Sequence, residues 1–171
     1  MKKLLFRKSK AALEGLTSYA LGSIIGIIVI VGLVSLYNAT SSKNDVISLK
    51  EALLHLNAEI TALFNGQTGY EDLTNDLVLE AQIVPNDLRK GKRLVNPFGG
   101  EINLYSNSDG SSFFIEVTEI PDKECIQLTD QSNSWKSVTV NNTELSKDNS
   151  SIEAIGLCSN SDKNTLKYES R

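Results

Sequence analysis

The chain of 171 residues is poor in the side chains on which most catalytic and metal sites are built, with one histidine and two cysteines. A nucleophilic serine or cysteine needs a neighbouring base, and His55 is the only histidine that could serve. His55 stands within a helical pattern of apolar residues, where we expect it on the solvent-facing flank. The cysteine and histidine spacing of a zinc site is absent. We therefore expect no enzyme, no metal site and no cofactor.

Charge is also missing from one long stretch. The 22 residues from Leu16 to Tyr37 contain no charged side chain. As a helix they would extend about 33 Å, enough to cross a hydrocarbon core of about 30 Å. The apolar part of a cleaved signal peptide usually has only about 7–15 residues. We predict that residues 16–37 form a transmembrane helix that is kept in the mature protein.

The charges around this segment predict its orientation. The first 15 residues carry five cations and one acid, Glu14, for a net charge of +4, so the rest carries −8 of the total −4. Positive residues before a span place the N-terminus in the cytoplasm and the C-terminal part outside. An acidic C-terminal part does not favour binding to nucleic acid. The five cations are Lys2, Lys3, Arg7, Lys8 and Lys10.

Three glycines, Gly22, Gly26 and Gly32, interrupt the predicted span. The first two form the pattern "GSIIG", in which small residues four apart allow two helices to approach closely. Two interpretations remain open. The glycines are ordinary residues of a membrane helix, or they pack helices of identical subunits against one another.

Residues 38–66 are predicted to continue the span as an amphipathic helix, so that residues of about 16–65 form one nearly continuous helix. The apolar residues are spaced alternately by three and four, which gives one buried stripe. Asn65 and Gly66 are a typical helix end. The stripe consists of Val46, Leu49, Leu53, Leu56, Ile60 and Leu63.

The remaining residues, 67–171, predict a small globular domain of the α+β class. The long N-terminal helix would pack on an antiparallel sheet accompanied by small helices, with residues 67–97 otherwise irregular. We expect the loops at 67–95 and 129–150 to carry any binding specificity, as surface loops usually do. The predicted strands are 101–106, 112–120, 137–142 and 165–170, and the predicted short helices are 72–82, 121–130 and 150–158.

Both cysteines, Cys125 and Cys158, fall in the part predicted to lie outside the membrane. An even number of cysteines in an oxidising compartment predicts one disulfide. The bridge would close a loop of about 34 residues and stabilise the domain by about 3.5–4 kcal/mol in the chain-entropy account. Two independent thiols are the alternative.

Several stretches together resemble type IVb pilins, in the group of the bundle-forming pilus subunits. They occur in the same order as in that family, over most of the chain from about residue 36. The spacing of "GQT-x-Y" and "NPFGGE" is the most specific part. The stretches are "FNGQTGYEDL" (64–73), "VPNDL" (84–88), "LVNPFGGEINL" (94–104), "DKECIQL" (122–128) and "LCSNSDKNTLKY" (157–168).

The resemblance implies the type IV pilin fold and a structural role. Such a protein is inserted in the inner membrane, cut by a prepilin peptidase, often N-methylated, and extracted from the lipid by the pilus assembly machinery. It then polymerises with itself into an extracellular filament for adhesion, aggregation or mating contact. An all-round apolar helix is satisfied by lipid or by neighbouring helices, so this transfer need not expose it to water.

The resemblance also implies a cleavage site, between Gly15 and Leu16, with residues 1–15 as leader. Cuts after Ser9 or after the alanines at 11 and 12 are alternatives. The fifth mature residue of the family is usually glutamate, whereas a cut after Gly15 puts Ala20 there and leaves Glu14 in the leader. This departure keeps three other roles open: a minor pilin, a pseudopilin of type II secretion, and an uncleaved, membrane-anchored periplasmic binding domain.

Overall fold

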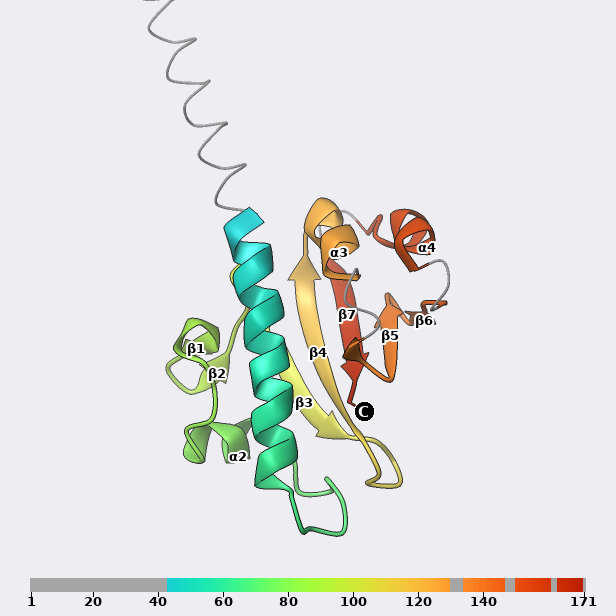
Figure 1. Ribbon diagram of the computed structural model, residues 1–171. Coiled ribbons are helices and arrows are strands. Elements are labelled where there is room, and N and C mark those ends of the chain that lie inside the picture. Colours follow the sequence, from blue (N-terminus) through green and yellow to red (C-terminus); the bar gives the residue numbers. More distant parts are fainter. Residues whose placement is uncertain (1–42, 130–133, 147–149, 161–162, 171) are drawn as a thin grey trace, which may run out of the picture. The chain divides into compact units, whose positions relative to one another are not determined.

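The computed structural model describes residues 43–129, 134–146, 150–160 and 163–170 (Figure 1). The chain divides into two compact units, Met1–Ser41 and Ser42–Arg171, and every described residue belongs to the second. The predicted leader, span and first residues of the amphipathic helix therefore lie outside the described residues. Within the described part of the chain, no helix is both long and apolar enough to cross a membrane.

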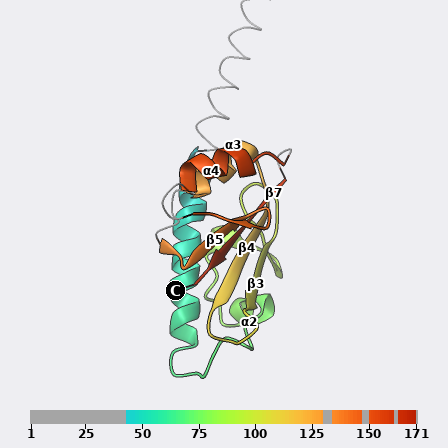
Figure 2. The same cartoon turned by 90° about the vertical axis from the view of Figure 1, so that its right-hand side faces the viewer.

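Residues 43–63 are α-helical, as the apolar spacing predicts. This N-terminal helix lies along one side of the sheet (Figures 1 and 2). The predicted stripe is buried from Val46 to Ile60, with no member more than 3% exposed. The prediction is wrong for Leu63, which is 38% exposed. The helix ends at that residue, and Phe64 packs partly against the core instead.

The sheet has five antiparallel strands in the order β3-β4-β7-β5-β6. β7, the last strand in sequence, lies in the middle, so the C-terminal segment is held on both edges by hydrogen bonds. Four of the five strands match predicted ones, whereas β6 was not predicted. The strands are β3 (Ile102–Ser106), β4 (Phe113–Ile120), β5 (Ser137–Val140), β6 (Thr143–Glu144) and β7 (Asn164–Glu169).

Side chains alternate between the two faces of the sheet. On β4, Phe113, Ile115 and Val117 are fully buried, whereas Phe114 and Glu116 between them are only half-buried. The buried side chains and the stripe of the N-terminal helix form one hydrophobic core. This arrangement confirms the predicted α+β class, with a helix packed on an antiparallel sheet.

Residues 67–97 contain more structure than predicted. The predicted helix is present but shorter, as α2 (Asn75–Glu80), with Thr74 accepting a hydrogen bond from the Leu77 amide as its cap. The side chain of Asn75 pairs with the backbone of Ile102 and Leu104, so α2 covers part of the edge of β3. The elements that were not predicted are η1 (Asn86–Leu88), β1 (Arg89–Lys90) and β2 (Arg93–Leu94).

Two short helices complete the described fold, α3 (Asp122–Leu128) and α4 (Ser150–Leu157). Both match predicted helices. The two helices contact each other, and α3 also contacts β7 (Figure 1). Through these contacts, α3 and α4 hold the C-terminal half of the domain together next to β7, the central strand.

Candidate assembly surface

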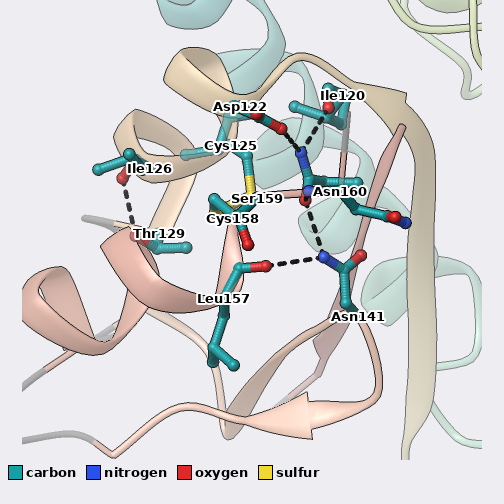
Figure 3. The surroundings of a disulfide bond; sticks show 12 residues. Ile120, Asp122, Cys125, Ile126, Thr129, Asn141, Leu157, Cys158, Ser159 and Asn160 are labelled. Atoms are coloured by element: carbon teal, nitrogen blue, oxygen red, sulfur yellow. Dashed lines mark hydrogen bonds between the residues drawn. A yellow bond between two sulfur atoms is a disulfide. The ribbon is translucent and has the colours of Figure 1, made fainter. Parts of the chain in front are cut away.

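The predicted disulfide is present and connects the two short helices. Cys125 lies in α3 and Cys158 directly after α4, and both side chains are buried (Figure 3). Their Cα atoms are 5.8 Å apart. The two cysteines are 33 positions apart in the sequence, and the segment between them includes β5, β6 and the surface helix α4. The bridge therefore fixes the position of α4 against the rest of the domain.

Asn164, a fully buried polar residue, lies at the centre of this half. Its Nδ2 donates to the Ile120 carbonyl (3.1 Å) and to Oδ1 of Asp122 (2.7 Å). Its Oδ1 accepts hydrogen bonds from Nδ2 of Asn141 (2.7 Å) and from the Asn160 backbone (3.2 Å). One side chain thus joins the end of β4, the start of α3, the β5–β6 turn and the loop before β7.

Asn141 extends this network to α4. Its Nδ2 also donates to the Leu157 carbonyl at 2.8 Å (Figure 3), and its Oδ1 accepts from the Thr165 amide. Asn141 has a φ of 48°, in the left-handed region that asparagine tolerates better than most residues. Sequence patterns give no signal for such a network, because its members come from separate elements.

The surface of α4 carries two exposed isoleucines, Ile152 (73% exposed) and Ile155 (64%), which lie nearly one turn apart. The opposite side of the helix, with Ala154, is buried. Two large apolar side chains close together on an exposed helix are a candidate surface for contact with another macromolecule. The sequence could not identify this stripe, because both sides of the helix contain apolar residues.

The "NPFGG" turn, on which the resemblance partly depends, is held by the buried side chain of Asn96. Its Oδ1 accepts hydrogen bonds from the amides of Phe98 (2.8 Å) and Gly100 (3.3 Å), and its Nδ2 donates to the Thr118 carbonyl (2.8 Å). A Cβ atom on Gly100 would collide with that same carbonyl. The motif therefore holds this turn against β4 through hydrogen bonds and close packing.

The β1–β2 hairpin carries four exposed cations around Gly91. Clefts of about 470 and 460 Å³ flank it, and each contains two acids beside two of the cations. Arg93 already pairs with Glu101 at 3.2 Å. Because acids surround the cations, the hairpin does not form a cationic surface for a polyanion. The cations are Arg89, Lys90, Lys92 and Arg93, and the acids are Asp76, Glu80, Glu101 and Glu119.

His55 is exposed on the N-terminal helix, as expected, and its Nε2 lies 3.7 Å from Oε1 of Glu59. Among the described residues, no group of three histidine, cysteine or acidic side chains is placed to hold a metal ion. The predicted cleavage site at Gly15 and Leu16 lies outside the described residues. So do the predicted packing glycines, Gly22, Gly26 and Gly32, and both features stay predictions.

Comparison with known proteins places this geometry in a family. The sequence family described as "PilS N terminal" matches residues 43–171. Two bundle-forming pilus major structural subunits, from Escherichia coli O127:H6 (strain E2348/69 / EPEC) and O111:H-, are each 25% identical over 101 residues. Each alignment covers 57% of this chain and 52% of the relative, so the chain spans about half the length of these relatives.

The solved structure of TcpA, a type IV pilin from the Vibrio cholerae El Tor biotype, superimposes with a TM-score of 0.56. The match covers 75% of this chain and 99% of that structure at 14% identity, and it shows the fold alone. The predicted resemblance to type IV pilins of the bundle-forming group is confirmed, and this is a family of structural subunits rather than enzymes. The chain belongs to the PilS N-terminal family and has the type IV pilin fold.

Proposed function

We propose that the chain is the prepilin of a type IVb pilus. Residues 16–37 hold it in the inner membrane, with the N-terminus in the cytoplasm and the folded domain in the periplasm. A prepilin peptidase cuts between Gly15 and Leu16, and the assembly machinery moves the subunit from lipid into a filament of identical copies. The filament is extracellular and serves adhesion, aggregation or mating contact.

The observation that carries the proposal is the combination of a pilin fold with a charge-free segment ahead of it. The fold and family are established for the C-terminal unit. The 22 uncharged residues that precede it can be enclosed either by lipid or by the same segment of neighbouring subunits. Residues 1–16 resemble a leader followed by a cleavage site. A domain that is anchored in the membrane and never polymerises would need neither.

The exposed isoleucines of α4 support self-association. A helical filament uses heterologous contacts, in which two different surfaces of the same subunit meet. Ile152 and Ile155 are suited to one side of such a contact, because the disulfide fixes their helix and their apolar surface gains from being covered. We assign this stripe to the contacts between folded domains within the filament.

The test is to produce the full chain in a bacterium that supplies a prepilin peptidase and a type IVb assembly machine, and to shear the cell surface. We expect filaments whose subunit mass corresponds to a chain that begins at Leu16. Gly15→Val should abolish cleavage and filaments, because the peptidase needs a small residue before the cut. Ala12→Val is the matched control and should leave both unchanged. Sheared filaments built of uncleaved chains would contradict the proposal, as would the absence of filaments.

Ala20 favours a second role, that of a minor pilin or pseudopilin. The usual glutamate at this position neutralises the amine of the mature N-terminus, and a buried charge without a partner is costly. A minor subunit needs to make this contact only a few times per filament. Quantifying the chain in sheared filaments distinguishes the roles, since a major subunit is their principal component and a minor one a trace.

A further inference from the structure

The face of the sheet that points away from the N-terminal helix carries two rows of side chains. Strand register places Asn103, Glu116, Lys167 and Thr139 in one row across four strands. The next row contains Tyr105, Phe114, Glu169 and Ser137. All eight are half-buried, and the N-terminal helix packs on the opposite face (Figure 2).

Two aromatic rings lie in contact on this face. The centroids of Tyr105 and Phe114 are 5.4 Å apart, and the ammonium group of Lys167 lies 5.0 Å from the centre of the Phe114 ring. Burial, helped by the charge of Glu116, raises the pKa of Tyr105. Antiparallel sheets that face water usually carry polar residues on that face. This pair of rings therefore provides apolar area that another surface could cover.

The charges of this face differ from those of the domain as a whole. Residues 16–171 carry a net charge of −8, whereas this face is nearly neutral. Lys167 lies directly opposite Glu116, and Glu169 is paired with Lys136 at 2.6 Å. Two acidic subunits repel each other over most of their surfaces, but not where these two rows face each other.

The two opposite charges of Glu116 and Lys167 can also match the same two charges on a second copy of the chain. Glu116 and Lys167 do not form an ion pair with each other, since Glu116 accepts from Asn103 and Lys167 lies over Phe114. A two-fold axis parallel to the strands and between β4 and β7 would place Glu116 of one copy opposite Lys167 of a second, and the reverse. The same patch on both partners is the property of an isologous contact.

We propose that this face, defined by the two rows and called the outer sheet face, binds the outer sheet face of a second copy of this chain in a neighbouring filament. The inference rests on the proposed function, because it takes the chain to be a filament subunit. An isologous contact closes after two copies and cannot extend a filament. The outer sheet face therefore joins filaments laterally, and the contacts within each filament use other surfaces.

Charge exchange on sheared filaments of the full chain tests this contact. Filaments of Glu116→Lys or of Lys167→Glu would each bring like charges together, and the fraction that sediments as bundles at low speed should fall by about tenfold or more. A mixture of the two variant filaments should form bundles again, because each now faces the opposite charge. The double exchange E116K/K167E should also restore bundles. Lys163→Glu, an exposed residue just before β7, makes the same change in net charge and should not disperse them.

The outcomes separate this contact from the proposed function. Wild-type filaments that stay single, or variant filaments that bundle like wild type, would overturn the lateral contact and leave the filament function intact. Loss of filaments in Lys167→Glu but not in Lys163→Glu would place Lys167 in a contact within the filament, which also overturns the inference. Binding to another molecule through this face would leave variant bundling unchanged and remove that binding instead. A wild-type chain that forms no filament contradicts both proposals.

Discussion

The two halves of the described domain are held together by different interactions. In the first half, residues 43–120, the N-terminal helix contributes a regular stripe of buried aliphatic residues to the hydrophobic core. In the second half, α3, β5, β6, α4 and β7 are joined by one disulfide and by the hydrogen bonds of one buried asparagine. Both halves share the hydrophobic core, to which the second contributes Trp135 and Tyr168, and the second half has a covalent bond and a buried polar network in addition.

Each half exposes two large apolar side chains, Ile47 and Leu63 on the long N-terminal helix and Ile152 and Ile155 on the short helix α4. The second half carries α4 with its two exposed isoleucines, so part of its apolar surface is not available to stabilise it. A covalent bond and a polar network can fix a short helix without burying both of its sides. The consequence is that loss of the disulfide or of the Asn164 network should loosen the second half first, whereas a cavity in the shared core should affect both halves.

Removing the disulfide should have the largest effect. Replacing Cys125 and Cys158 by alanine should lower the free energy of unfolding by about 4 kcal/mol, because the enclosed loop gains freedom in the unfolded chain. Urea unfolding of the detergent-solubilised chain, followed by the fluorescence of the single tryptophan, Trp135, measures the change. Hydrogen exchange should accelerate in α4 and β5 more than in residues 43–63, because the bridge also restricts partial openings of the loop that it closes. Equal acceleration in both halves would contradict the distinction.

A cavity in the first half should lower the free energy of unfolding by somewhat less, but it should affect both halves of the domain. Leu56→Ala removes a fully buried side chain from the helix stripe, and we expect a loss of about 3 kcal/mol. Leu63→Ala is the control, because that leucine is partly exposed at the end of the same helix, and its loss should be below about 1 kcal/mol. Exchange should accelerate in both halves in Leu56→Ala. An effect confined to the helix would mean that the core is not shared.

Asn164→Ala tests how much the hydrogen bonds of the buried Asn164 side chain contribute to stability. The substitution leaves the side chains of Asp122 and Asn141 without one partner each in a largely buried place, and we expect a loss of about 2 kcal/mol. Asn160→Ala is the matched control, since its side chain is exposed and donates a hydrogen bond to the Lys163 carbonyl. The disulfide should still form, which a thiol assay verifies. An equal loss in both variants would show that the buried hydrogen bonds of Asn164 contribute no more to stability than the exposed one of Asn160.

The same contrast explains which features the sequence could predict. The helix stripe and the four longer strands follow from local periodicity, and the disulfide follows from the number of cysteines and their compartment. The β1–β2 hairpin was missed because each strand has only two residues. The partners of Asn164 are up to 44 positions away in the sequence, so no local pattern contains them. Leu63 was misassigned because periodicity does not locate the residue at which the helix ends.

Glu169 connects the two halves, and its replacement should have the smallest effect. It accepts hydrogen bonds from Ser112, just before β4, and from Lys136 and Ser137 on the other side of β7. Burial alone would raise the pKa of Glu169, but these hydrogen bonds, chiefly that from Lys136, outweigh it and lower the pKa below the usual 4.5. A carboxyl whose pKa is lower in the folded than in the unfolded state stabilises the fold above pH 4.5 and loses that contribution as the pH falls through the folded value.

Glu169→Gln should therefore cost about 1 kcal/mol at neutral pH, with the contribution of Lys136 reduced by its exposure to water. The difference from wild type should shrink as the pH falls below 4.5, because the wild-type carboxyl then becomes protonated. Thermal unfolding from neutral to acidic pH measures this, with Glu80→Gln as an exposed control. A difference that persists at acidic pH would contradict the role of the charge, because glutamine and a protonated glutamate have nearly the same shape and are both uncharged. The β4–β7 ladder and the hydrogen bond from Asn164 to the Ile120 carbonyl connect the two halves in either case.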